Sequence, residues 1–158
     1  MAAFVLIHGA GDVGWYWHLV EAELRALGHD TVAPDLPCDD DSAGLVEYAD
    51  TVVAAIGDRT GLVVVGQSLG GFVAPLVCER VPVDRLVLVA PMIPAPGEAV
   101  TEYFANTGYR DEANTGNRHE TTGDPFYQDV PPELAAEARR RGRAQSEVRM
   151  GEATPMRE

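Results

Sequence analysis

One serine in the chain lies between two glycines that follow a short apolar run, which is a common position for a nucleophile. Residues 62–65 are Leu-Val-Val-Val and residues 66–70 are Gly-Gln-Ser-Leu-Gly, which matches the pattern G-x-S-x-G. Where a strand turns sharply into a helix, the glycines permit the tight backbone and the serine hydroxyl stands clear of the sheet. The pattern therefore predicts that Ser68 is the nucleophile of an acyl-transfer site, whereas a chance match would leave an ordinary turn.

A second glycine-rich turn, at residues 8–14, contains the other groups that such a nucleophile needs. It reads His-Gly-Ala-Gly-Asp-Val-Gly and follows the first apolar run of the chain. An acyl-transfer site stabilises its oxyanion with the amide after the nucleophile and with an amide from the loop after a neighbouring strand. We therefore expect the backbone N–H groups of Leu69 and Ala10 to form the oxyanion hole, beside the positive end of the helix that begins near Ser68.

The same turn also matches a dinucleotide-binding pattern, G-x-G-x-x-G, through Gly9, Gly11 and Gly14. Acidic residues lie about 20 positions further on, as that fingerprint requires. However, residues 15–17 are Trp-Tyr-Trp, and bulky aromatic rings at this point would crowd a pyrophosphate. Dinucleotide binding is thus kept as an alternative, while the acyl-transfer interpretation calls for neither a cofactor nor a metal ion.

Short apolar runs rich in β-branched residues predict four strands that hold these turns, at residues 4–8, 31–34, 62–65 and 85–89. Segments of helical period lie between or after these runs, at residues 17–27, 43–56 and 68–80. This alternation is typical of a parallel sheet with helices on both faces. The predicted fold class is therefore α/β, with three layers in the order helix, sheet, helix.

The composition changes after Ala90, so we divide the chain into a core at residues 1–96 and a cap-like segment at residues 97–158. Prolines follow the last predicted strand, and a polar stretch covers residues 106–123. One more helix is predicted at residues 132–148, and no further apolar strand pattern appears. We expect the second segment to lie over the core as a lid, with the last strands of the sheet absent.

From residue 4 to about residue 96, the chain resembles the α/β-hydrolase superfamily. His-Gly-Ala-Gly at residues 8–11, together with Trp15 and Trp17, is similar to the branch of small esterases and hydroxynitrile lyases, which includes plant methylesterases. The resemblance implies a truncated α/β-hydrolase core and an esterase-type activity. It also implies that Ser68 is the nucleophile, with the two backbone donors given above.

The sequence does not identify the general base or the acid that a serine nucleophile needs. A hydroxyl requires an imidazole within hydrogen-bond reach and a third group that orients the imidazole. In the superfamily both groups follow later strands, which this chain does not show. His119 is the only histidine after Ser68, and its polar surroundings favour a surface role, while His8 is assigned to the first turn. Either the chain is a fragment that lacks these groups, or it is a short relative that has lost hydrolysis.

Composition limits the partners that the chain can have. It carries 25 acidic and 12 basic side chains, a net charge of −13, which opposes binding to nucleic acid or to an anionic membrane surface. No apolar run reaches the roughly 18 residues that a membrane-spanning helix needs. Cys38 and Cys78 have neither metal-site spacing nor a disulfide framework, so we expect a cytoplasmic location.

Two functions from different classes remain open. The first is a serine hydrolase that acts on a small carboxylic ester. The second is a non-catalytic protein of the same fold, which binds a small apolar ligand between sheet and lid. Six aromatic residues are the candidate lining of that pocket: Trp15, Trp17, Tyr103, Phe104, Phe126 and Tyr127. Because the last strand would leave an open sheet edge, we also expect a second copy of the chain to cover it.

Overall fold

The computed structural model describes residues 1–108 and 126–157. The elements are, in chain order, β1 (Ala3–Ile7), the 3₁₀-helix η1 (Gly14–Trp17), α1 (His18–Ala26), β2 (Asp30–Val32), α2 (Leu45–Ile56), β3 (Leu62–Gln67), α3 (Gly70–Cys78), β4 (Arg85–Val89), α4 (Val100–Asn106) and α6 (Pro132–Arg141). All four predicted strands are present, and their ends differ from the prediction by no more than two residues.

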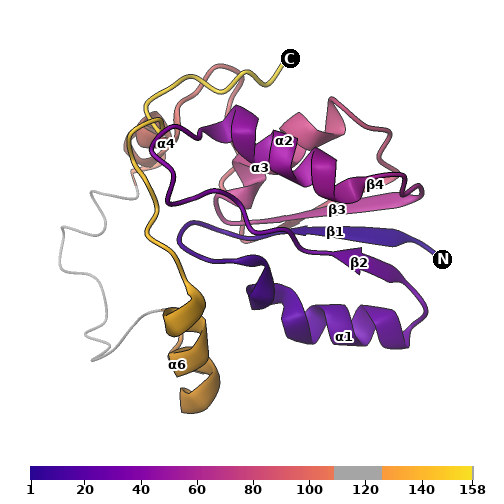
Figure 1. Cartoon of the computed structure of the whole chain (residues 1–158). Helices are drawn as coiled ribbons and strands as arrows, with labels where there is room; N and C mark the ends of the chain where they lie inside the picture. Colours follow the sequence, from indigo (N-terminus) through magenta and orange to yellow (C-terminus); the bar gives the residue numbers. More distant parts are fainter. Residues whose placement is uncertain (109–125, 158) are drawn as a thin grey trace.

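The four strands form one parallel sheet in the order β2-β1-β3-β4. Ala3 of β1 pairs with Asp30 of β2 on one side and with Leu62 of β3 on the other. Helix α1 covers one face of the sheet, and α2 and α3 cover the other (Figure 1). The predicted three-layer α/β architecture is therefore confirmed.

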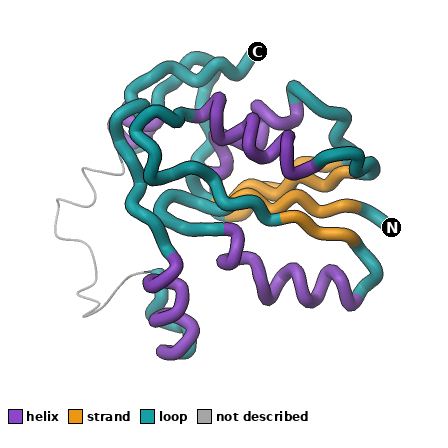
Figure 2. Tube along the Cα trace, in the orientation of Figure 1, coloured by secondary structure: helices purple, strands orange, loops and turns teal. Residues whose placement is uncertain are grey.

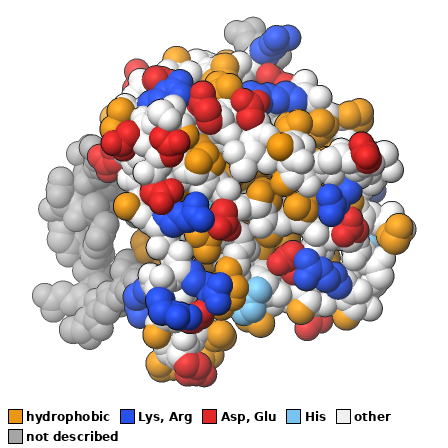
Figure 3. Space-filling view, in the orientation of Figure 1, with side chains coloured by type: hydrophobic (Ala, Val, Ile, Leu, Met, Phe, Trp, Pro, Cys, Tyr) orange, Lys and Arg blue, Asp and Glu red, His pale blue; other side chains and the backbone are white. Residues whose placement is uncertain are grey.

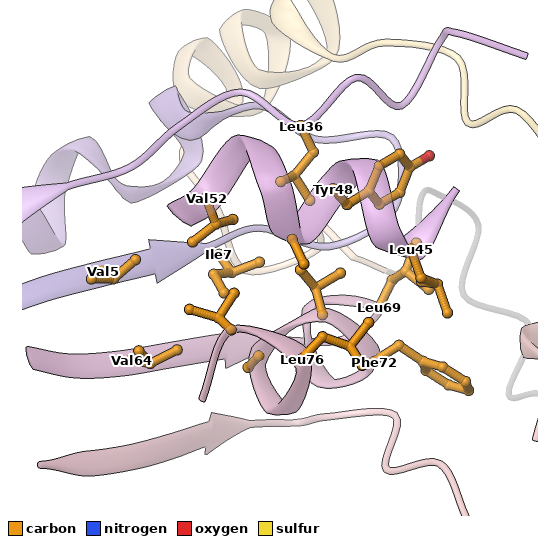
Figure 4. Packing of buried hydrophobic residues seen from close by; sticks show 14 of the residues in the cluster. Val5, Ile7, Leu36, Leu45, Tyr48, Val52, Val64, Leu69, Phe72 and Leu76 are labelled. Carbon is orange, nitrogen blue, oxygen red and sulfur yellow. The ribbon is translucent and has the colours of Figure 1, made fainter. Parts of the chain in front are cut away.

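The larger core lies between the sheet and the layer formed by α2 and α3 (Figure 4). Strand β1 contributes Val5 and Ile7, and β3 contributes Val64, because side chains on one face of a strand alternate. Helix α2 adds Val52 and α3 adds Phe72, and all five side chains are inaccessible to solvent. This closely packed apolar layer fixes the position of α3 relative to the end of β3.

The opposite face of the sheet carries a smaller core. Leu6, Val63 and Val65 pack there against Trp17 of η1 and the partly buried Leu24 of α1. Helix α1 itself has no fully buried residue. The two faces of the sheet are thus covered unequally.

All four predicted helices are present with shorter bounds than predicted, and one helix was missed. The helix predicted at residues 68–80 begins at Gly70. The helix predicted at residues 132–148 ends at Arg141, so its last part was wrong. Helix α4 was not predicted, because seven residues are too few to show a clear helical period.

The last helix stops early because the chain after it bonds to distant loops. We call residues 142–157 the C-terminal strap. The Arg143 N–H donates to the Gly11 carbonyl at 2.9 Å, and the Ser146 N–H donates to the Cys38 carbonyl at 2.7 Å. These bonds replace the helical bonds that residues 142–148 would otherwise make.

Ion pairs hold the strap against α2 and the loop that precedes it. Arg143 pairs with Asp35 at 3.0 Å, and Arg149 pairs with Glu47 at 2.8 Å. The loops gather with α6 at the carboxyl ends of the strands (Figure 2). Within the described ranges, no helix is long and apolar enough to cross a membrane.

The outer side of β4 is an open edge of the sheet. In the part of the chain that the structure describes, β4 pairs with β3 alone. Residues 86–89 are all aliphatic, and their exposed fractions lie between 36% and 42%. Natural edge strands are usually protected by charges, prolines or bulges, and residues 86–89 contain no charge and no proline.

We predict that a second copy pairs with this edge, so the 158-residue chain should elute in light-scattering chromatography at twice its 17.0 kDa mass. Val87→Lys should yield the monomer, because a charge on β4 opposes strand pairing. The matched control is Val46→Lys, which places the same charge at an exposed position of α2 and should leave the dimer intact. A wild-type chain that elutes as a monomer would contradict the prediction.

Candidate active site

Ser68 occupies a strained turn between β3 and α3. Its φ angle is +51°, a left-handed conformation that costs free energy for a residue with a side chain. Three hydrogen bonds hold this backbone. The Ser68 N–H donates to the Val89 carbonyl at 3.3 Å, and the Ser68 carbonyl accepts from the N–H groups of Gly71 and Met92, both at 2.9 Å. The end of β4 and the segment after it therefore help to fix the turn.

The glycines around Ser68 are required because other backbone atoms approach them closely. A Cβ atom on Gly66 would lie 2.6 Å from the Gly70 carbonyl oxygen, and one on Gly70 would lie 2.8 Å from that of Ile7. A Cβ atom on Gly71 would lie only 2.2 Å from the Met92 carbonyl oxygen. The G-x-S-x-G-G sequence is thus explained by tight packing as well as by backbone conformation.

Ser68 opens into a cavity of about 840 Å³ at the carboxyl ends of the strands. Ala10 lines the same cavity, so the structure brings together the turns after β1 and β3. Ala90, the other non-glycine residue with a positive φ angle (+42°) among those described, also lines it. Strained backbone therefore gathers at this one site, as it often does at functional sites.

The two amides expected to bind an oxyanion have no acceptor within the described residues. Neither the Ala10 N–H nor the Leu69 N–H donates a backbone hydrogen bond there, although the neighbouring amides of Ser68 and Gly71 do. The Leu69 side chain packs into the larger core (Figure 4), so only its backbone is available for chemistry. Leu69 directly precedes α3, whose N-terminal end carries a partial positive charge.

Four of the six aromatic residues expected in the pocket line the cavity: Tyr103, Phe104, Phe126 and Tyr127. The two tryptophans do not line it, and that expectation was wrong. Trp17 packs into the smaller core, and Trp15 stacks on His18 with ring centroids 4.1 Å apart. Tyr16 lies between them in the sequence and does reach the cavity.

His8 is a structural residue of the first turn, as expected. Its side chain is fully buried, its Nδ1 bonds to the Gly9 carbonyl at 2.8 Å, and its Nε2 accepts from the Leu36 N–H at 3.0 Å. Burial lowers the pKa of His8, so the ring is neutral near pH 7. A neutral ring that is fully bonded joins the turn after β1 to the loop after β2, and it has no proton to offer the cavity.

No histidine belongs to the described residues that line the cavity. His119 lies outside the described residues. Within those residues there is also no group of three or more potential metal ligands. The described lining therefore provides a hydroxyl and amides, without the imidazole that would activate the hydroxyl.

Asp12 is a residue of the cavity that sequence reasoning did not single out. It is half-buried and lines the cavity together with Ser68. Burial raises the pKa of Asp12 to about 6, and a hydrogen bond with the Tyr127 side chain opposes part of this rise. The two residues are 115 positions apart, so no local pattern in the sequence could have indicated this environment.

A family model described as the alpha/beta hydrolase family matches residues 4–157. The chain belongs to the α/β-hydrolase family. This match agrees with the parallel sheet, the strained serine turn and the cavity at the carboxyl ends of the strands.

Among curated proteins, this α/β-hydrolase is 42% identical over 109 residues to a probable esterase, PIR7A, of Oryza sativa subsp. indica, a match that covers 60% of this chain and 41% of the relative. It is 31% identical over 138 residues to norfluorocurarine synthase 2 of a Strychnos species, which covers 77% of this chain and 52% of the relative. The chain thus spans about half of these relatives or less.

Among solved structures, the chain is similar to an extracellular α/β-hydrolase from a Paenibacillus species, with a TM-score of 0.74 and 23% identity. That match covers 99% of this chain and 72% of the other. A variant of polyneuridine aldehyde esterase gives a TM-score of 0.72 at 22% identity, covering 93% of this chain and 70% of the other. At this identity the likeness shows the fold alone.

The dinucleotide alternative is wrong for this α/β-hydrolase, and the structure gives the reason. The Gly14 N–H already donates to the Asp35 carboxylate at 2.8 Å. The α-helix begins at His18, beyond the glycine-rich turn, and cannot present its N-terminus to a phosphate as that fingerprint requires.

We predict that Gly71→Ala strongly destabilises the fold, because the new methyl group would meet the Met92 carbonyl oxygen. A loss of about 2–4 kcal/mol in the free energy of unfolding is expected in urea denaturation. The matched control is Gly151→Ala, where the nearest atom to the new methyl group lies 3.9 Å away. Equal stability of the two variants would show that the approach of Met92 to the turn is not tight.

We predict that Asp12→Asn stabilises the fold at pH 8 and leaves it unchanged at pH 4. The folded-state pKa of about 6 lies above the usual 3.8, so the folded chain binds more protons between these values. The contribution of Asp12 to the free energy of unfolding is therefore fully present at low pH, and it is lost as the pH rises through 6. After allowance for solvent screening, the gain at pH 8 is about 1 kcal/mol.

Urea denaturation at both pH values measures this difference. Asp58→Asn is the control, because Asp58 is exposed and lies outside the cavity, and it should change stability equally little at pH 4 and pH 8. A gain for Asp12→Asn that does not vary with pH would rule out a buried carboxylate as its cause.

Proposed function

We propose that this chain carries the nucleophile and the oxyanion hole of a serine esterase that acts on a small carboxylic ester. The observation that carries the proposal is the strained Ser68 at a cavity, next to two turns whose Ala10 and Leu69 amides are without acceptors in the described residues. A serine held in this way needs no rearrangement before it attacks a bound carbonyl.

The reaction follows from these positions. Ser68 Oγ forms a bond to the carbonyl carbon of the ester, and the negative charge on the carbonyl oxygen is stabilised by the two amides. The bond to the alkoxy oxygen then breaks, and the proton from the serine goes to the leaving alcohol. Water adds to the acyl-enzyme in the second half, which releases the acid and restores the hydroxyl.

Proton transfer in both halves requires a base, and the described lining has no histidine to provide the imidazole that usually serves a serine nucleophile. Removing the base from such a site costs several orders of magnitude in rate and leaves mainly the contribution of the oxyanion hole. This observation favours a second candidate function for the 158-residue chain, which is binding of a small ligand without turnover. The plant relatives that are named as esterases support the esterase for the whole protein.

The surface supports a small molecule as the partner rather than nucleic acid or a membrane. Arginines gather over α6 (Figure 3). Two of them, Arg140 and Arg141, form ion pairs with Glu137 of the same helix. These ion pairs reduce the local positive charge, and the net charge of the chain is −13, so the field does not favour a phosphate backbone. We also propose a cytoplasmic location, since Cys38 and Cys78 are both unpaired thiols.

A fluorophosphonate probe tests the proposed nucleophile, because it reacts with serine hydroxyls that a protein activates. We expect labelling of the wild-type chain at a slow but measurable rate, and none in Ser68→Ala. Ser42→Ala is the matched control, because Ser42 is an exposed serine outside the cavity, and it should be labelled like the wild type. Labelling of Ser68→Ala, or of no variant at all, would reject the esterase and favour ligand binding.

A further inference from the structure

Asp12 is a carboxylate inside the cavity that the proposed acyl transfer does not use. It follows Ala10 by two residues on the turn after β1, and it lines the same cavity as Ser68. Its side-chain hydrogen-bond partner is Tyr127. Among the described residues it forms no ion pair with an arginine. No arginine among the described residues therefore neutralises its charge.

Two titratable groups whose pKa values are raised in part by the Asp12 charge, Tyr16 and Cys38, are themselves uncharged. Burial, and then the nearby Asp12, raise the pKa of the Tyr16 hydroxyl. Burial raises the pKa of the Cys38 thiol to about 11, with Asp12 as a minor contributor. The Tyr16 hydroxyl and the Cys38 thiol are therefore protonated near pH 7 and carry no charge that could offset the Asp12 carboxylate.

Two arginines, Arg139 and Arg143, also line the cavity, and neither forms an ion pair with Asp12. Arg143 is neutralised by Asp35 at 3.0 Å and by Asp39 at 3.7 Å. The Arg139 guanidinium lies 5.0 Å from the centre of the Tyr127 ring. This contact shows that a ring of the cavity already stacks with a cation.

Aromatic rings make up much of the remaining lining: Tyr16, Tyr103, Phe104, Phe126 and Tyr127. The negative faces of such rings attract ammonium groups, most strongly where water is excluded. An unneutralised carboxylate among aromatic rings is therefore suited to an organic cation.

We propose that Asp12 determines substrate specificity, and that the cavity favours an ester carrying a protonated amine over one carrying a carboxylate. The inference rests on the proposed function, because it places this amine in the cavity that holds Ser68. An ammonium group gains attraction from the Asp12 carboxylate and from the ring faces. A carboxylate in its place meets a like charge in a half-buried site, where solvent screens less than in bulk water.

The test compares three probes with the same phenyl ring and carbon chain, namely 4-phenylbutylamine, 4-phenylbutanamide and 4-phenylbutanoate. Their dissociation constants are measured by calorimetry on the 158-residue chain at pH 7.5. We expect the amine to bind about tenfold more tightly than the carboxylate, with the neutral amide between them. At pH 5 the preference should shrink, because Asp12 is then largely protonated.

Asp12→Asn keeps the shape of the side chain and removes its charge, so it should bring the amine and the carboxylate to within about twofold of each other. Asp58→Asn makes the same change of charge at an exposed position outside the cavity and should preserve the wild-type preference. The pH series on the wild-type chain gives the same information without any substitution.

Equal affinities for the amine and the carboxylate, a preference for the carboxylate, or no binding of the amine would each overturn the inference. So would an Asp12→Asn variant that retains the wild-type preference. Because these measurements need no turnover, they are separate from the labelling of Ser68. A wild-type chain that is not labelled by the fluorophosphonate probe but keeps the amine preference would reject the esterase and leave the role of Asp12 standing.

Discussion

The structure depends on one constraint, which is that a residue with a side chain is held in the left-handed conformation at the end of β3. The surrounding chain must supply more stabilisation than this conformation costs. It does so with hydrogen bonds from the end of β4 and from α3, and with glycines that let β1, β3 and the segment after β4 approach the turn. The dry core beneath α3 prevents the turn from relaxing, since any shift of the helix would open a cavity.

The cavity is lined by polar backbone groups, aromatic rings and charged side chains that come from different parts of the fold. Turns at the carboxyl ends of β1 and β3 contribute backbone amides and a hydroxyl, while α4, α6 and the residues around them contribute rings and arginines. The C-terminal strap then joins the cavity to α2 and the loop before it through Arg143 and Arg149. Ion pairs and backbone hydrogen bonds thus hold the strap together with apolar packing, because Met150 of the strap is buried in the larger core.

The sheet and the serine turn could be predicted because their signals are local. Apolar runs gave the strands, and the glycines around Ser68 gave the turn. The end of α6 and the burial of Asp12 depend on contacts between residues about a hundred positions apart, which no window of the sequence contains. Trp17 was misplaced for a related reason, because a ring next to a glycine-rich turn can face the cavity or the sheet, and only the smaller core decides between them.

The open edge of the sheet and the nucleophile are joined more directly than their separation in sequence suggests. Val89, the last residue of β4, accepts the hydrogen bond from the Ser68 N–H, and Met92, three residues later, donates to the Ser68 carbonyl. Any strand that docks on β4 therefore restricts the segment that holds the serine. By thermodynamic linkage, pairing of a strand with that edge and the geometry of the Ser68 hydroxyl depend on each other. The reactivity of Ser68 therefore depends on whether the edge of β4 is paired.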